Sequence, residues 1–256
     1  MEKKKLILFD LDGTIAESNK RAYDAILITL AMNKDDKYEY GIVSGGCYEK
    51  ISEQVGLINI KDDKKEPLFN YVFCENGMIG YKNNTLLFKK HLKEEFNDNE
   101  LLEVEKLILD TVSKNINIYQ NTTRKIERRN SLWYFAPCGI DCNDKMRNDF
   151  IELDKKENIR TNIIKILKDD LLNKFNLEIK LGGNISLSIY PKHWGKSYII
   201  KNKVIDKEKY SKIYFFGDKC QTNGNDFPLY NHPDITGIEV KDPNDTLSKI
   251  MNLSFL

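Results

Sequence analysis

The amino-acid sequence predicts an α/β fold in which a doubly wound parallel sheet is interrupted by an α+β insertion. Near both ends of the chain, short apolar runs that end in acidic, hydroxyl or glycine residues alternate with helical patterns. In the middle, hairpin patterns and helices follow one another without regular strand–helix alternation, which is typical of an α+β region. We therefore expect the two ends of the chain to share one sheet, with the insertion forming a second domain.

The first strand is predicted at residues 6–9, where four apolar residues precede Asp10-Leu11-Asp12-Gly13-Thr14. A continuous apolar run indicates a strand buried on both faces, and open α/β sheets place their chemistry at the carboxyl ends of such strands. In an extended chain Asp10 and Asp12 project to the same side, and Gly13 permits an immediate turn. One carboxylate can then attack a substrate while the other accepts and donates protons. The alternative is an acidic turn after a core strand.

The remaining elements follow in chain order. The pattern predicts helices at residues 20–30 and 48–55, and strands at 40–43 and 71–74. In the middle it predicts a hairpin at 81–88, a helix at 99–114, strands at 116–119 and 132–135, a helix at 159–173, and a hairpin of 177–181 with 185–190. The last part holds a helix at 197–204, strands at 213–216 and 236–240, and a helix at 246–253. We expect residues 1–81 and 189–256 to form the sheet domain and 82–188 the insertion.

A hydroxyl and two glycines, Ser44-Gly45-Gly46, follow the strand predicted at residues 40–43. Backbone N–H groups at such a position are open to an anion, so this turn suits a phosphate. A tight strand–helix turn without a ligand is the alternative. The position beside the first motif favours the phosphate interpretation.

Other charged residues stand near the ends of predicted strands. Asp218 directly follows the strand at 213–216, Asp226 lies a few residues later, and Lys196 follows Gly195. Phosphoryl transfer through an aspartate needs a divalent cation, a fixed positive charge and donors for phosphate oxygens. Carboxylate oxygens are preferred ligands of Mg²⁺. A surface lysine and a helix cap are the alternatives for Lys196 and Asp226. We expect a site made of Asp10, Asp12, Asp218 and Asp226 as metal ligands, with Lys196 as the fixed cation.

Composition argues against a nucleic acid or a membrane as partner. Lys and Arg number 40 against 39 Asp and Glu, a net charge of +1. The sequence shows neither a signal-peptide pattern nor an apolar run long enough to span a bilayer, so we expect a cytoplasmic protein. The five cysteines are expected to be free thiols, because the sequence gives no sign of secretion to a compartment where disulfides form. No histidine stands at zinc-site spacing from Cys138 and Cys142.

The string Asp10-Leu11-Asp12-Gly13-Thr14, preceded by apolar residues, resembles the catalytic signature of the haloacid dehalogenase superfamily of phosphotransferases. The resemblance implies that Asp10 is the nucleophile that becomes an aspartyl phosphate, and that Asp12 is the general acid/base. Two like charges this close push their proton affinities apart, which suits two different roles.

Further strings resemble the eukaryotic-type phosphomannomutase family, from Leu6 to about Val240. The resemblance implies a Rossmann-like core with an inserted cap, and homodimerisation through that cap. It also implies Mg²⁺, a hexose 1,6-bisphosphate activator, a hexose phosphate substrate, and conversion of mannose 6-phosphate to mannose 1-phosphate for GDP-mannose biosynthesis. The strings are Glu75-Asn76-Gly77, Glu127-Arg128-Arg129-Asn130, Glu-Leu-Asp-Lys-Lys-Glu-Asn-Ile-Arg at 152–160, Gly182-Gly183-Asn184-Ile185-Ser186 and Phe215-Phe216-Gly217-Asp218-Lys219.

The insertion carries residues that match the family's substrate-binding positions. A mutase must hold one phosphate while the other end of the sugar reacts, and arginines bind phosphate bidentately. Arg129 and Arg147 stand at matching positions, and Ser186 can bind phosphate or sugar hydroxyls; solvated basic residues are the alternative. The chain departs from the family pattern at three positions, with Asn19 and Ile140 in place of arginines and Ser188 in place of an aspartate.

Three functions are compatible with these motifs. A phosphomannomutase-like phosphotransferase is the leading hypothesis. A sugar-phosphate or sugar-bisphosphate phosphatase would use the same motifs but release phosphate to water, and the three departures keep it open. A catalytically inactive binding protein is the third, and buried charges that destabilise a fold without serving catalysis argue against it.

Overall fold

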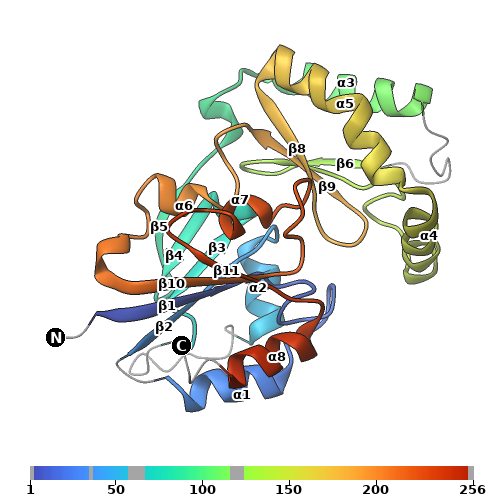
Figure 1. Cartoon of the computed structure of the whole chain (residues 1–256). Helices are drawn as coiled ribbons and strands as arrows, with labels where there is room; N and C mark the ends of the chain where they lie inside the picture. Colours follow the sequence, from blue (N-terminus) through green and yellow to red (C-terminus); the bar gives the residue numbers. More distant parts are fainter. Residues whose placement is uncertain (1–2, 35–36, 57–66, 116–123, 253–256) are drawn as a thin grey trace. The chain divides into compact units, whose positions relative to one another are not determined.

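The computed structural model describes residues 3–34, 37–56, 67–115 and 124–252, and the chain divides into two compact units (Figure 1). Unit 1 comprises Met1–Lys89, Trp194–Thr222 and Asp226–Leu256, and unit 2 comprises Lys90–His193 with Asn223–Asn225. Within the described ranges, no helix is both long enough and apolar enough to cross a membrane.

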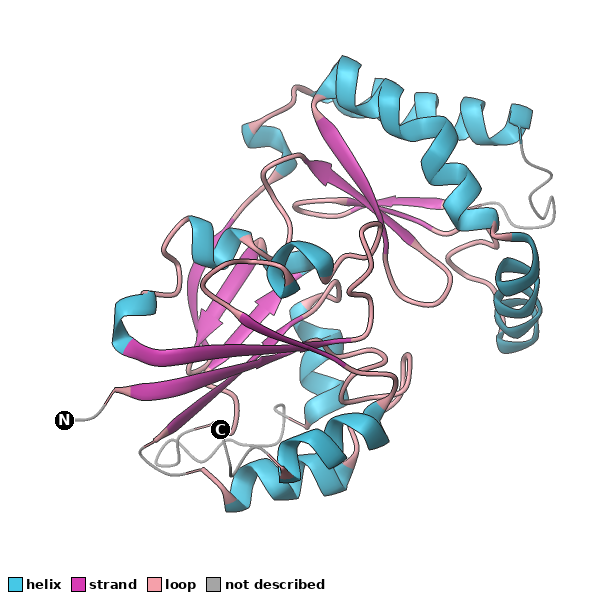
Figure 2. Cartoon of the chain, in the orientation of Figure 1, coloured by secondary structure: helices cyan, strands magenta, loops and turns pink. Residues whose placement is uncertain are grey.

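Unit 1 is built on a seven-stranded sheet in the order β11-β10-β1-β2-β3-β4-β5. Figure 2 draws the strands in magenta and the helices in cyan. The first five strands in this order are parallel to their neighbours, whereas β4 and β5 are added antiparallel at the edge. The strands are β1 (Lys4–Phe9), β2 (Tyr38–Val43), β3 (Tyr71–Cys74), β4 (Ile79–Lys82), β5 (Thr85–Lys89), β10 (Tyr210–Gly217) and β11 (Thr236–Glu239).

Helices cover both faces of this sheet, which is why its central strands are apolar throughout. On one face, Ile7 and Phe9 of β1 belong to an apolar cluster with residues of α1 (Asp24–Met32), α2 (Tyr48–Val55) and α8 (Pro243–Met251). On the other, Leu6 and Leu8 cluster with residues of α6 (Tyr198–Lys201) and α7 (Phe227–Tyr230). This doubly wound arrangement confirms the fold class predicted for the two ends of the chain.

The strands predicted at 6–9, 40–43, 71–74, 213–216 and 236–240 and the helix predicted at 48–55 are all present in unit 1. The hairpin predicted at 81–88 is present as β4–β5, and Asn83 and Asn84 take left-handed φ values of 46° and 63° at its turn. It pairs with β3 in the large sheet, so the units divide after Lys89 and after His193 instead of at the predicted 81 and 188. The helix predicted to end at 253 is described as far as Met251.

Unit 2 contains a four-stranded antiparallel sheet in the order β6-β7-β9-β8. Its apolar residues include Trp133 and Phe135 of β7 and the buried residues of α3 and α5. The elements are α3 (Asp98–Asn115), β6 (Ile126–Arg128), β7 (Trp133–Phe135), α4 (Asp144–Glu157), α5 (Ile159–Phe175), β8 (Leu177–Leu181) and β9 (Leu187–Pro191).

The α+β character predicted for the insertion agrees with unit 2. The predicted helices at 99–114 and 159–173 match α3 and α5, and the hairpin around Gly182-Gly183-Asn184 is β8–β9. The charged segment before residue 159 forms a separate helix, α4, which ends at Asn158 in the left-handed conformation. The strand predicted at 116–119 lies outside the described residues.

Candidate active site

The carboxyl ends of three neighbouring strands of unit 1 bring the motifs together. In the parallel register, Phe9 at the end of β1 lies between Ile42 of β2 and Phe216 of β10. Asp10 continues the ladder, because its N–H donates to Phe216 O at 2.8 Å. Asp10, Ser44 and Asp218 therefore leave the sheet at the same edge, since parallel strands end there together.

Lys196 is the buried cation of the site. Its side chain is fully buried, and Nζ donates to Asp10 Oδ1 and, at 2.6 Å, to Asp226 Oδ1. Burial opposes the charged form, but the two carboxylates raise the pKa of Lys196 above its usual value. Lys196 therefore stays protonated and fixes the direction of the Asp10 carboxylate.

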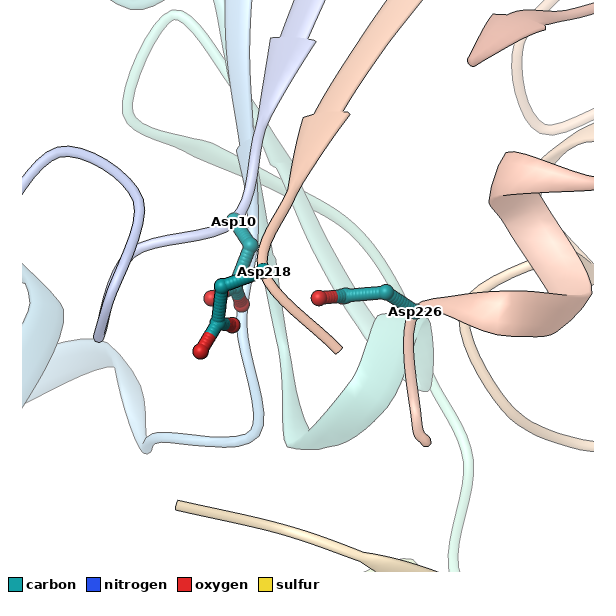
Figure 3. Close-up of side chains that lie close together, drawn as sticks. All are labelled: Asp10, Asp218 and Asp226. Atoms are coloured by element: carbon teal, nitrogen blue, oxygen red, sulfur yellow. The ribbon is translucent and has the colours of Figure 1, made fainter. Parts of the chain in front are cut away.

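Asp218 completes a group of three carboxylates (Figure 3). One oxygen each from Asp10, Asp218 and Asp226 lies within 4.8 Å of the others. Lys219 Nζ donates to Asp218 Oδ2 at 2.5 Å, and the Lys219 N–H donates to Asp226 Oδ2 at 2.9 Å. Asp218 Oδ1 is buried and has no hydrogen-bond partner among the described residues.

The charge balance of this cluster favours a bound cation. Three carboxylates face the ammonium groups of Lys196 and Lys219, so full ionisation leaves one negative charge in excess. Burial, opposed by Lys196 and reinforced by Asp226 and Asp218, raises the pKa of Asp10 to about 7. A divalent cation would satisfy both this charge and the free oxygen of Asp218, so the residues present fit a metal site.

Two glycines let the backbone approach these carboxylates. A Cβ at Gly13, whose φ is 98°, would lie 2.4 Å from Asp218 Oδ2. A Cβ at Gly217 would lie 2.8 Å from Asp226 Cγ. Gly13 is therefore required both for the turn after β1 and for the position of Asp218.

Asp12 does not join the three carboxylates, although the sequence analysis predicted it as a fourth metal ligand. Its Oδ1 accepts from the Asn19 N–H at 2.9 Å and from Gln54 Nε2 at 3.0 Å, and its Oδ2 accepts from Lys50 Nζ at 3.2 Å. Burial opposes ionisation, yet Lys50 and the two other donors lower the pKa of Asp12 below its usual value. The carboxylate is thus held ionised beside α2.

The Ser44-Gly45-Gly46 turn precedes the first turn of α2 and is fixed by its own hydrogen bonds. The Ser44 N–H donates to Phe73 O at 2.9 Å, and the Gly46 N–H donates to Ser44 Oγ at 3.2 Å. The helix begins after Cys47, which provides no side-chain cap. The amino-terminal end of α2 therefore remains available to an anion.

The predicted residues of unit 2 surround Tyr134. Arg129 Cζ lies 4.4 Å from the centre of the Tyr134 ring, and Arg129 Nε donates to Glu127 at 2.9 Å. Ser186 is hydrogen-bonded to Tyr134, and the charge of Arg147 also acts on the phenol. Arg129, the charge of Arg147 and the Ser186 hydroxyl therefore all act on one side chain, Tyr134.

Sequence reasoning missed Lys50, Gln54, Lys219 and Tyr134. Lys219 adjoins Asp218, and Lys50 lies one helical turn before Gln54, but neither pattern differs from that of ordinary exposed residues. Only the folded contacts distinguish them. All five cysteines are free, as predicted, and Cys138 and Cys142 have their Sγ atoms 3.7 Å apart.

A sequence profile described as eukaryotic phosphomannomutase matches residues 27–256. The chain belongs to the eukaryotic phosphomannomutase family. The phosphomannomutase of Encephalitozoon cuniculi is 34% identical over 249 residues, which cover 97% of this chain and 93% of that protein. Phosphomannomutase 2 of Dictyostelium discoideum is 32% identical over 99% of this chain and 98% of its own length, and human phosphomannomutase 1 is 30% identical over 99% and 94%.

Solved structures confirm the fold of this phosphomannomutase family member. An IMP-bound Plasmodium falciparum IMP-nucleotidase, truncated at its N-terminus, aligns with a TM-score of 0.62 and 20% identity, covering 99% of this chain and 69% of that one. The C-terminal domain of C. albicans trehalose-6-phosphate phosphatase aligns with a TM-score of 0.60 and 17% identity, covering 100% and 93%. At these identities the two likenesses show the fold alone.

Proposed function

We propose that this chain is a phosphomannomutase that interconverts mannose 6-phosphate and mannose 1-phosphate through an aspartyl phosphate on Asp10. The supporting observation is the buried contact of Lys196 with both Asp10 and Asp226, in a chain that matches phosphomannomutases along nearly its whole length. A carboxylate nucleophile must be ionised and correctly directed. The charge of Lys196 opposes the effect of burial on the pKa of Asp10, and its hydrogen bond directs the carboxylate.

Asp10, Asp218 and Asp226 are proposed to hold Mg²⁺, as oxygen ligands of a hard cation. When bound, the ion neutralises charge on the transferring phosphoryl group. Asp10 forms the new bond to phosphorus while the bridging oxygen of the sugar phosphate leaves. Lys196 stays protonated throughout and balances the charge of Asp226.

Asp12 is proposed as the group that moves the proton. Its carboxylate is ionised, so it can accept the proton of the sugar hydroxyl that attacks the aspartyl phosphate. In the reverse half of the cycle it returns this proton to the leaving sugar oxygen. Lys50 and Gln54 orient the carboxylate for this exchange.

Ser44, Gly45 and Gly46 are proposed to bind phosphate oxygens next to Asp10. The N–H groups of Ser44 and Gly46 already donate within the chain, so the proposed donors are the Ser44 hydroxyl and the N–H groups at the start of α2, which this turn precedes. Arg129, Arg147 and Ser186 of unit 2 are proposed to bind the substrate's other phosphate or its hydroxyls. A hexose 1,6-bisphosphate is the proposed activator, since it would phosphorylate Asp10 and leave a hexose phosphate. Unit 2 is accordingly proposed as the cap.

A homodimer through unit 2 is also proposed. Leu102 is 58% exposed and Leu109 is 38% exposed on α3. Residues seven positions apart lie on the same face of a helix, so these leucines form an apolar strip. A second copy of the chain could cover it.

A sugar-phosphate phosphatase is the second candidate, and the neighbourhood of Asn19 favours it. The basic residues that could replace an arginine at this position are paired with carboxylates: Lys20 with Glu17 at 2.5 Å and Arg21 with Asp24 at 3.5 Å. In unit 2, Arg128 is paired with Glu105 at 2.6 Å. A weaker hold on the bisphosphate would expose the aspartyl phosphate to water.

One assay separates the candidates. Mannose 1-phosphate and Mg²⁺ are supplied with and without glucose 1,6-bisphosphate, while mannose 6-phosphate and inorganic phosphate are measured together. Activator-dependent isomerisation supports the mutase. Release of phosphate without isomerisation supports the phosphatase and contradicts the mutase, and the absence of both products contradicts both. The Asp10→Asn variant is the matched control, and no turnover is expected from it.

A further inference from the structure

The direction of Tyr134 follows from its neighbours on β7. Trp133 and Phe135 are both fully buried, and Trp133 Nε1 donates to Glu105 of α3 at 3.1 Å. Successive side chains of a strand point to opposite faces, so Tyr134 points away from α3. It is half-buried and lies opposite Ser188 of β9 in the register. The small Ser188 side chain cannot cover the tyrosine ring.

Two guanidinium groups act on the tyrosine, and Glu127 lies opposite Tyr134 in the register of β6 and β7. The Arg129 guanidinium lies over the ring with its Cζ 4.4 Å from the ring centre, and its Nε is held by Glu127. The charge of Arg147 acts on the phenol as well. Arg147 itself is half-buried and forms no ion pair with any residue in the described part of the chain. A half-buried guanidinium without a carboxylate partner suits an anionic ligand.

The hydroxyl of Tyr134 keeps its proton at neutral pH. Burial, opposed by the hydrogen bond with Ser186 and by both arginines, raises the pKa of Tyr134 above its usual value, so the phenol is protonated at neutral pH. The phenol shares a hydrogen bond with the Ser186 hydroxyl, in which either oxygen can be the donor.

We infer that Tyr134 contacts the substrate, and that its O–H donates to an oxygen of the phosphate held by Arg129 and Arg147. This inference rests on the proposed function, because it takes the ligand of unit 2 to be a hexose phosphate. The tyrosine adds a neutral donor beside Arg129, and its ring fixes Arg129 by stacking. Such a donor distinguishes a tetrahedral oxyanion from other anions by direction as well as by charge.

The test replaces the hydroxyl alone. Tyr134→Phe keeps the ring and the stacking of Arg129, so the thermal midpoint should change little. Binding of mannose 6-phosphate is measured by calorimetry in metal-free protein, where turnover does not interfere. We expect binding to weaken roughly 10-fold, the lower end of what a hydrogen bond to a charged group contributes. Tyr190→Phe is the matched control, since that tyrosine lies in the same sheet and is only 1% exposed.

Kinetics provide the second readout. The KM for mannose 1-phosphate and for glucose 1-phosphate should rise by the same factor in Tyr134→Phe, because the two sugars differ at a hydroxyl and share the phosphate. Unequal factors would indicate a sugar contact and overturn the inference, as would unchanged binding or an equal loss in Tyr190→Phe. If the wild type binds mannose 6-phosphate through Tyr134 but isomerises nothing, the proposed function fails and the inference stands. If the wild type does not bind it, the inference fails.

Discussion

Lys196 Nζ donates to Asp226 Oδ1 at 2.6 Å, and both side chains are fully buried. The same ammonium group also holds Asp10. One cation thus connects the residue after β1 to the residue before α7. Because each carboxylate would otherwise be a buried charge without a partner, the lysine determines both the stability and the chemistry of the site.

Replacing Lys196 by methionine should therefore destabilise the fold and stop catalysis. The variant keeps the length of the side chain but leaves Asp10 and Asp226 without their cation, which is expected to lower the free energy of unfolding by about 3–5 kcal/mol. Urea denaturation and turnover of mannose 1-phosphate measure the two effects. Lys207→Met is the control, because its 2.8 Å ion pair with Asp234 is exposed to solvent and such pairs contribute little to stability. Equal stability of the two variants would contradict this account.

The pKa of Asp10, raised by burial to about 7, predicts a pH dependence of stability in metal-free protein. A carboxyl with a higher pKa in the folded state binds a proton there that the unfolded chain releases. The contribution of this proton to the free energy of unfolding is complete below about pH 4. It is lost as the pH rises through about 7, by at most about 1.4 kcal/mol per pH unit. Denaturant titrations from pH 4 to 8 should show this fall in the wild type relative to Asp10→Asn.

Mg²⁺ should abolish that difference in pH dependence, because the ion competes with the proton for the same oxygens. With saturating Mg²⁺, the wild type should be stabilised most at high pH. Identical pH profiles of the metal-free wild type and Asp10→Asn would show that Asp10 is ionised without a cation. Asp206→Asn, at an exposed 3₁₀-helix cap, is the control for removal of a carboxylate elsewhere.

The sequence predicts the convergence of Asp10, Ser44 and Asp218 because a strand-end position is a local property. Once apolar runs identify parallel strands, their carboxyl ends must share an edge. The direction of Asp12 was not predictable in the same way. An extended chain through Leu11 would place Asp12 on the same side as Asp10, but β1 ends at Phe9 and the turn directs Asp12 toward α2.

The other features that the sequence did not predict also have specific physical causes. Gln54 and Lys50 approach Asp12 only because α2 packs beside the turn after β1, and a helical pattern does not state which neighbour a polar residue meets. β6 has three residues, too few for a periodic signal. In the sequence, Tyr134 looks like any aromatic residue of a strand. Its proposed role in binding becomes visible only in the fold, where Arg129 stacks on its ring.

Gly13 offers a test of how closely Asp218 must be positioned. Gly13→Ala puts a Cβ 2.4 Å from Asp218 Oδ2, and its φ of 98° adds backbone strain. Displacement of one carboxylate by about 1 Å is expected to reduce turnover on the order of 100-fold. Gly56→Ala is a matched control, since its φ is 73° but no atom of the described residues lies within 4 Å of the new Cβ.

Both alanine variants should therefore lose about 1 kcal/mol of stability from the left-handed backbone, measured by urea denaturation. Only Gly13→Ala should lose turnover and require more Mg²⁺ for half-maximal activity. If Gly13→Ala had the same turnover as Gly56→Ala, the Asp218 carboxylate could move without loss of activity. The turn at Gly13 would then not be needed to position Asp218.

The apolar strip on α3 predicts the oligomeric state. Leu102, 58% exposed, and Leu109, 38% exposed, lie seven residues apart on one helix face. Changing both to glutamate should convert a dimer to a monomer in sedimentation velocity, because burying two carboxylates opposite their own copies is strongly unfavourable. Ile28→Glu is the control, as Ile28 is also 58% exposed but lies on α1 of unit 1. A dimer that persists in the double variant, or that dissociates in Ile28→Glu, would contradict an interface through α3.

The monomeric variant should still unfold cooperatively, because each unit has its own core. The lower mass in sedimentation then shows that the dimer has dissociated and not that the fold has been lost.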